Sequence, residues 1–201
     1  MAIKILANDG ISETGKVALE REGFEVITTK VAQNQLVDYI NKHSIDALIV
    51  RSATQVRKDI IDGCPTLKLI GRGGVGMDNI DVAYAKSKQL HVINTPASSA
   101  NSVAELVFAH LFTGVRYLHD ANRNMPLEGD QRFSELKKNY NNGAELRGKT
   151  LGIIGFGRSG QAVARIAIGL GMRVLAYDPN VQEAVITLSF FDGQETSFAV
   201  K

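Results

Sequence analysis

The stretch TLGIIGFGRSG, residues 150–160, sets three glycines in the spacing G-x-G-x-x-G directly behind a short apolar run. The run TLGII predicts a buried strand, and SGQAVARIAIGLG at 159–171 predicts a helix. A second strand is predicted in MRVLAYDP at 172–179. A strand, a glycine turn, a helix and a further strand are typical of a unit that binds a dinucleotide.

Each glycine of this motif has its own physical reason. Gly155 permits the tight turn, Gly157 has no side chain to block a pyrophosphate, and Gly160 lets helix and strand pack closely. The helix N-terminus offers unpaired N–H groups to the phosphates. Asp178, at the end of the next predicted strand, is placed to accept hydrogen bonds from the adenosine ribose. Because an acid there repels a 2′-phosphate, we expect NAD rather than NADP.

Arg158 follows Gly157 directly. Its backbone N–H is expected to face the pyrophosphate. Its side chain either adds a charge-assisted contact or remains solvated on the first helical turn.

The first hundred residues alternate short apolar runs with amphipathic segments, a pattern that predicts a parallel sheet covered by helices on both faces. Ser12 is the expected N-cap of the first helix, and Gly23 is expected to end it. The predicted strands are 3–7, 24–28, 46–50, 67–72 and 91–95, and the predicted helices are 13–22, 34–43 and 81–89.

The pattern changes near residue 98. Residues 98–123 predict one long helix, and the polar, Gly- and Asn-rich residues 124–149 predict an arm that contains a short helix. Asp192-Gly193 lies between two alternating runs and predicts a β-hairpin. We therefore expect two domains, 1–97 and 98–201.

The composition is that of a globular protein, with 201 residues, 44% hydrophobic residues and a net charge of +2. The weak charge argues against a nucleic-acid partner. Cys64 is the sole cysteine, which excludes an internal disulfide and a thiolate metal cluster and favours a cytoplasmic setting. We expect no metal, and no apolar run long enough to span a membrane.

Four blocks of the sequence closely resemble the D-2-hydroxyacid dehydrogenase family, in order and in spacing, with the phosphoglycerate branch most similar. They are LIVRSAT (48–54), LIGRGGVGMDNID (69–81), VINTPASSANSVAE (92–105) and LRGKTLGIIGFGRSG (146–160). The resemblance implies a flavodoxin-like substrate domain and the first part of a Rossmann domain, whereas the predicted C-terminal hairpin departs from the family pattern. It also implies NAD and a small 2-hydroxy acid, expected to be 3-phosphoglycerate.

The resemblance also implies roles for individual residues. Arg51 and Ser52 match the loop that contacts the distal group of the substrate, and an arginine suits a phosphate or carboxylate there. Gly74, Val75 and Gly76 match the loop whose amides hold the substrate carboxylate, and glycine-rich turns of this kind form anion nests.

On the cofactor side, Val75 matches the contact to the nicotinamide end. Arg158, Ser159 and Asp178 match the pyrophosphate and ribose contacts. The helix at 98–123 and the arm after it resemble the dimerisation region of the family, so we expect a homodimer.

The family's catalytic arginine, glutamate and histidine have no counterpart in this chain. All four histidines precede the glycine motif and are expected to be structural: His43, His91, His110 and His119. We therefore expect a fragment or a natural short form with no catalytic residue of its own, inactive when alone. The alternatives are an inactive NAD-binding or dimerisation module, or a related formate, glyoxylate or D-lactate dehydrogenase.

Overall fold

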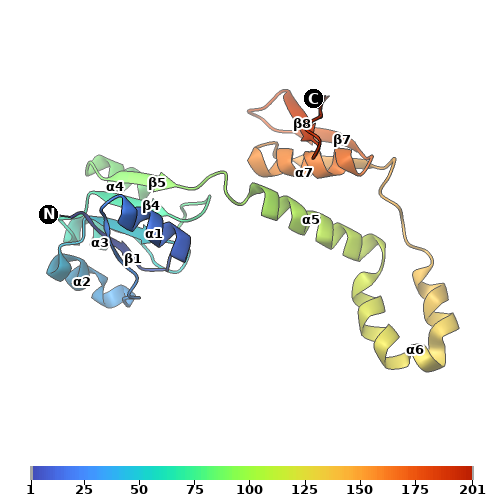
Figure 1. Ribbon diagram of the computed structural model, residues 1–201, viewed down its shortest axis with the longest axis horizontal. Helices are drawn as coiled ribbons and strands as arrows, with labels where there is room; N and C mark the ends of the chain where they lie inside the picture. Colours follow the sequence, from blue (N-terminus) through green and yellow to red (C-terminus); the bar gives the residue numbers. More distant parts are fainter. Residues whose placement is uncertain (1, 201) are drawn as a thin grey trace. The chain divides into compact units, whose positions relative to one another are not determined.

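The computed structural model describes residues 2–200, and the chain divides into two compact units between Ser98 and Ser99 (Figure 1). The first unit contains five parallel strands in the order β2-β1-β3-β4-β5. This strand order is the flavodoxin-like one, as the resemblance implied. The strands are β1 (Lys4–Ala7), β2 (Glu25–Ile27), β3 (Ala47–Val50), β4 (Leu69–Arg72) and β5 (His91–Asn94).

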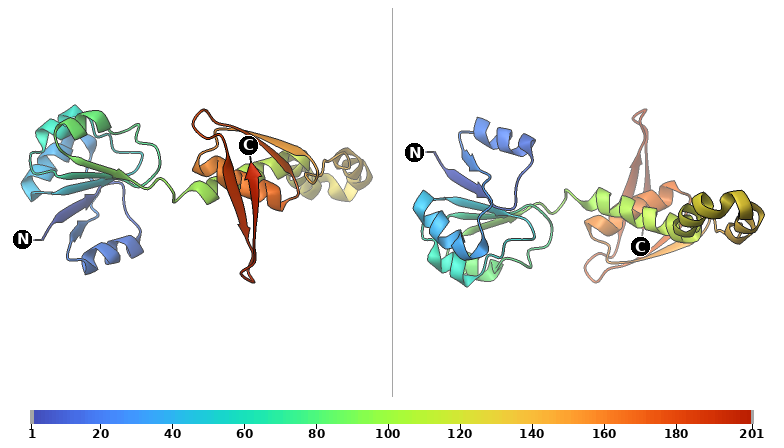
Figure 2. Two further views of the ribbon diagram at one scale, coloured as in Figure 1. Left: turned by 90° about the horizontal axis from the view of Figure 1, so that it is seen from above. Right: turned by 90° about the horizontal axis from the view of Figure 1, so that it is seen from below.

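Helices cover the two faces of this sheet unequally, because α1 lies alone on one face and the others lie on the opposite face (Figure 2). The buried core fills the opposite face, where Leu6, Leu48 and Ile70 of the strands join Ile40 and Ile60 of the helices. The helical elements are α1 (Glu13–Arg21), η1 (Gln33–Gln35), α2 (Leu36–His43), α3 (Lys58–Gly63) and α4 (Val82–Ser87). The helix α3 was not predicted, because its six residues are too few to show a helical period.

Both predicted ends of α1 are confirmed. The amide of Gly15 donates to the Ser12 hydroxyl over 3.2 Å, which caps the first turn. Gly23 follows the helix with a φ of +86°, a conformation that favours glycine.

The second unit is built around α7 (Arg158–Gly169), which packs against α5 (Ala100–Val115) and against the parallel strands β6 (Thr150–Ile154) and β7 (Arg173–Tyr177). Small residues make the close helix contact possible, since Ala104 of α5 and Ala167 of α7 are fully buried in it. The predicted hairpin is confirmed as β8 (Ala184–Ser189) and β9 (Glu195–Val200), which are antiparallel.

The expected single helix over 98–123 is wrong. The helix α5 ends at Val115, Tyr117 takes a left-handed conformation with a φ of +55°, and α6 (Leu118–Tyr140) then begins. The reason is a tertiary contact, because the amide of Ala144 donates to the carbonyl of Val115 over 2.9 Å and satisfies the end of α5.

The arm is also more helical than predicted, because α6 occupies most of it. The helix bends back on itself at Arg132, whose φ of −118° is not helical (Figure 1). The side-chain amide of Asn124 donates to the Tyr140 hydroxyl over 2.9 Å and joins the two limbs. Pro126 and the many polar residues hid this helix from the sequence pattern.

Candidate functional site

The glycine turn of the second unit has the geometry that the motif predicts. Gly155 has a φ of +92°, and its amide donates to the carbonyl of Tyr177 over 2.8 Å, which ties the turn to the end of β7. A Cβ at Gly160 would lie 2.2 Å from the carbonyl oxygen of Gly155. Only glycine therefore fits at position 160, and α7 begins in close contact with the end of β6.

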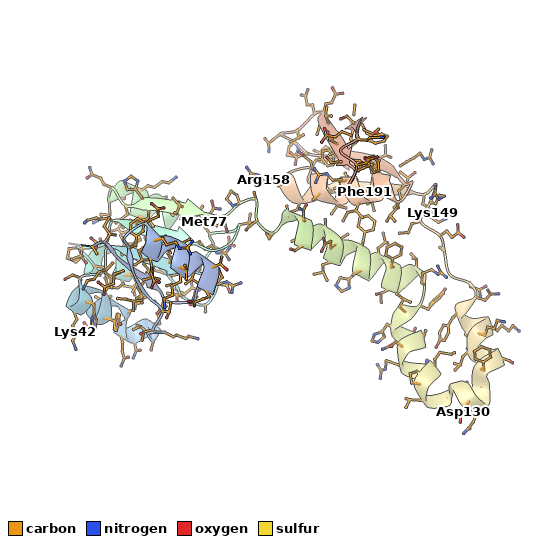
Figure 3. All side chains as sticks on the ribbon, in the orientation of Figure 1. Lys42, Met77, Asp130, Lys149, Arg158 and Phe191 are labelled. Carbon is orange, nitrogen blue, oxygen red and sulfur yellow. The ribbon has the colours of Figure 1, made fainter. Side chains whose placement is uncertain are left out.

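The first turn of α7 is open to a ligand. Gly157 is its N-cap, and no side chain among residues 2–200 caps the turn. Within the described chain, a Cβ at Gly157 would meet nothing within 4 Å. Arg158 and Ser159 are exposed beside it, and Figure 3 marks Arg158 at the start of the helix. Free amides and a positive helix end make this turn suitable for an anion.

Asp178 lies next to this turn and stabilises it. One carboxylate oxygen accepts from the Phe156 amide over 2.7 Å, and the other accepts from the Asn180 amide over 2.8 Å. These hydrogen bonds, from Asn180 first and then Phe156, hold the pKa of Asp178 below its usual value. Each oxygen has a second lone pair, so the carboxylate retains capacity for a hydroxyl of a ligand.

The first unit has a cavity of about 690 Å³ at the carboxyl ends of its strands. Its apolar floor is the sheet face beside α1, formed by Ile49, Leu69 and Ile93. Asp9, Arg51 and Arg72 are the charged residues in its lining. Ligands of open α/β sheets bind at this end of the strands.

One of the predicted substrate residues lies in the lining of this cavity, and the others lie on the loops after β3 and β4. Arg51 lines it, and Ser52 is exposed on the same loop after β3. Gly74, Val75 and Gly76 form the turn after β4. The amide of Gly74 donates to the carbonyl of Arg72 over 2.9 Å, whereas the amides of Val75 and Gly76 have no acceptor within the described residues.

Arg72 is a charged residue of the lining that the sequence did not mark as a site residue. Its Nε–H donates to the side-chain oxygen of Asn79 over 3.3 Å, and its guanidinium lies over Gly74, where a Cβ would come within 2.2 Å of Nη1. Its position as the last residue of β4 was the available indication, since residues at strand carboxyl ends face the ligand edge of such sheets.

The other side chains considered for catalysis or metal binding, among the described residues, are Cys64 and the histidines. Burial, and then Asp59, raises the pKa of the Cys64 thiol to about 11, so this cysteine stays protonated and is a poor nucleophile. His43 stacks on Tyr39 with ring centroids 4.3 Å apart. Among residues 2–200, no three His, Cys, Asp or Glu side chains gather as a metal site would require, and no helix is long and apolar enough to cross a membrane.

A flavodoxin-like sheet whose cavity is lined by two arginines, together with a dinucleotide-type glycine turn, defines a two-unit α/β protein of the dehydrogenase type. The family model of the D-isomer specific 2-hydroxyacid dehydrogenase catalytic domain matches residues 5–194. The chain therefore belongs to the D-isomer specific 2-hydroxyacid dehydrogenases.

Relatives within the family carry different names. The chain is 40% identical over 190 residues to a hydroxypyruvate reductase of Thermotoga maritima, covering 94% of this chain and 60% of the relative. It is 38% identical over 183 residues to a D-3-phosphoglycerate dehydrogenase of Methanocaldococcus jannaschii, covering 91% and 33%. The NAD⁺-bound 3-phosphoglycerate dehydrogenase of Entamoeba histolytica superposes with a TM-score of 0.69 at 30% identity, covering 90% and 56%. The chain thus spans 60% or less of the length of these relatives.

Proposed function

We propose that this chain supplies the substrate- and cofactor-binding residues of an NAD-dependent oxidoreductase that acts on 3-phosphoglycerate. The observation that carries the proposal is the pair Arg51 and Arg72 in the lining of one cavity, followed by a turn on which the amides of Val75 and Gly76 have no acceptor among the described residues. The substrate has a phosphate at one end and a carboxylate at the other. The arginines suit the phosphate, and the amides suit the carboxylate.

In the proposed reaction, hydride leaves C2 of the hydroxy acid for the nicotinamide, and the hydroxyl proton passes to a base. We assign no residue of this chain to that base. His43 is stacked on Tyr39, and His91, His110 and His119 lie on β5, α5 and α6. The 201-residue chain is therefore expected to bind both ligands and to turn over neither.

Binding of 3-phosphoglycerate by the chain tests this function. Calorimetric titration is expected to show saturable binding, and Arg51→Leu or Arg72→Leu is expected to weaken it by about tenfold, because each removes a charge-assisted contact. Lys42→Leu, on α2, is the control and should leave the affinity unchanged. Equal affinity in all four proteins would refute the assignment, and NADH formation by the chain alone would refute its inactivity.

Hydroxypyruvate reduction is the second candidate, favoured by the Thermotoga maritima relative. Hydroxypyruvate carries a carboxylate but no phosphate, so only one anionic group would be matched by the cavity. Tighter binding of hydroxypyruvate than of 3-phosphoglycerate would favour this candidate. The same comparison with formate, glyoxylate and D-lactate tests the other branches of the family.

We further propose NAD rather than NADP, on the basis of Asp178 at the end of β7. Asp178→Asn is expected to reduce the preference for NADH over NADPH by about tenfold, because the variant no longer repels a 2′-phosphate. Nucleotide fluorescence on binding measures both affinities. Asp192→Asn is the matched control, since Asp192 also accepts a backbone amide, from Gln194, and lies in the same unit. An unchanged preference in Asp178→Asn would remove this argument for NAD.

A homodimer through α5 is also proposed. Val103, Leu106 and Val107 of this helix are 42%, 58% and 39% exposed, which is unusual for neighbouring apolar side chains. Leu106→Glu is expected to convert a dimer to a monomer in light scattering, whereas Lys42→Glu on α2 should not. A monomeric unaltered chain at about 100 µM, well above the Kd of a stable dimer, would contradict this proposal.

The two units are assigned accordingly. Residues 1–97 are proposed as the substrate-binding domain, and residues 98–201 as the bridging helix, the arm and part of the cofactor domain. A cytoplasmic location fits the lone Cys64, which is free and buried. No nucleic-acid or membrane partner is proposed.

A further inference from the structure

We infer that Asp9 and Asn79 form a clamp that positions Arg51 and Arg72 for one anionic group of the substrate. The inference rests on the proposed function, and it assigns two positioning residues that do not themselves contact the ligand in the proposed role.

The clamp holds the loop after β3 from both sides. Asp9 accepts from the amides of Arg51 and Thr54 with one oxygen, over 2.7 and 3.1 Å. Asn79 donates its side-chain amide to the carbonyls of the same two residues, over 2.9 and 2.7 Å. Both backbone groups of Arg51 and of Thr54 are therefore fixed, and Arg51 leaves the loop in a defined direction.

Asn79 joins this loop to the second arginine. Its side-chain nitrogen donates to two carbonyls, so its oxygen must face the other way, and there it accepts from Nε of Arg72 over 3.3 Å. Asn79 is only 7% exposed, so water does not compete easily for these bonds. The amide cannot flip without setting its oxygen against two carbonyl oxygens. One buried side chain thus orients both arginines.

Hydrogen bonds from the same loop keep Asp9 in its charged form. Burial works against the charge, but hydrogen bonds from the Thr54 hydroxyl and from the amides of Thr54 and Arg51 outweigh it and lower the pKa of Asp9. The Thr54 hydroxyl donates to Asp9 over 2.7 Å and accepts from buried Asn8 over 2.9 Å. Three hydrogen bonds from the loop after β3 thereby hold the carboxylate against that loop.

The preference for 3-phosphoglycerate over D-glycerate tests the clamp, because the two ligands differ only in the phosphate. It is measured by calorimetry on the 201-residue chain, as the Kd for D-glycerate divided by the Kd for 3-phosphoglycerate. Asn79→Leu is expected to reduce this ratio by about tenfold, because both arginines lose their orientation. A general loss of protein stability would weaken the binding of both ligands equally and leave the ratio unchanged.

Asn79→Asp is the second variant and retains the size of the side chain. Its carboxylate would repel the carbonyls of Arg51 and Thr54 and neutralise Arg72, so the same loss of preference is expected. Asn41→Leu is the matched control, since Asn41 also donates its amide to a carbonyl, that of Gly63 over 2.7 Å, but lies on α2. It should leave the ratio unchanged.

The unaltered chain offers an independent measurement by NMR. The Nε–H of Arg72 is expected to exchange with water more slowly than that of Arg51, because only the former has an acceptor among the described residues. Equal exchange, or a preference for 3-phosphoglycerate that both Asn79 variants retain, would overturn the clamp alone. No preference in the unaltered chain would overturn the proposed substrate together with the clamp.

Discussion

Replacing Gly157 by valine is expected to weaken NAD binding by about a hundredfold or more while the chain stays folded. Gly157 has a φ of −71°, which valine adopts readily, and a Cβ there meets nothing within 4 Å among the described residues. The added side chain would instead occupy the space where the proposed pyrophosphate approaches the first turn of α7. The substitution should therefore lower the affinity for NAD without lowering the stability of the fold.

Calorimetry with NAD and thermal unfolding of Gly157→Val together measure this separation. Gly152→Val is the matched control, because Gly152 lies on β6 of the same unit and a Cβ there also meets nothing within 4 Å in the described chain. The control should bind NAD normally. Unimpaired binding by Gly157→Val would show that the turn does not hold the nucleotide.

Replacing Gly160 by alanine is expected to have the opposite signature, a loss of stability in the second unit. The new Cβ would lie 2.2 Å from the carbonyl oxygen of Gly155 and 3.3 Å from Cγ2 of Ile153. The obstacle is backbone, so α7 or the turn must move, and overpacking of this kind costs about 1–3 kcal/mol or more. Calorimetric unfolding should show a lower Tm for the transition of this unit.

Gly169→Ala is the control for that experiment. Gly169 is the last residue of the same helix, and a Cβ there meets nothing within 4 Å among residues 2–200. Alanine should be neutral, or stabilising by up to about 1 kcal/mol, because it restricts the unfolded chain. If both variants behaved alike, the close contact between α7 and the turn would not be the reason for Gly160.

The sequence was sufficient where a local pattern decides the structure. The five strands of the first unit, the turn at Gly155 and the cap at Ser12 depend on apolar runs, positive φ and side-chain capping, all of which are visible within a few residues. The hairpin around Gly193 belongs to the same group.

The sequence was insufficient where contacts between distant residues decide. Ala144 bonds to the end of α5 at Val115, and the bond between Asn124 and Tyr140 joins the two limbs of α6. Asn79 looked like one more residue in a glycine-rich block, yet its buried amide reaches Arg51 and Thr54 on another loop. No periodicity marks such bonds, because they form only once the strands are paired.

Titration of the unaltered chain with NAD and with NADP tests the central claim most directly, that this chain carries a dinucleotide site at Gly155–Gly160 completed by Asp178. Calorimetry is expected to show one saturable site per chain, tighter for NAD than for NADP, and lost in Gly157→Val. A folded chain that binds neither nucleotide, or that binds NADP more tightly, would contradict this account.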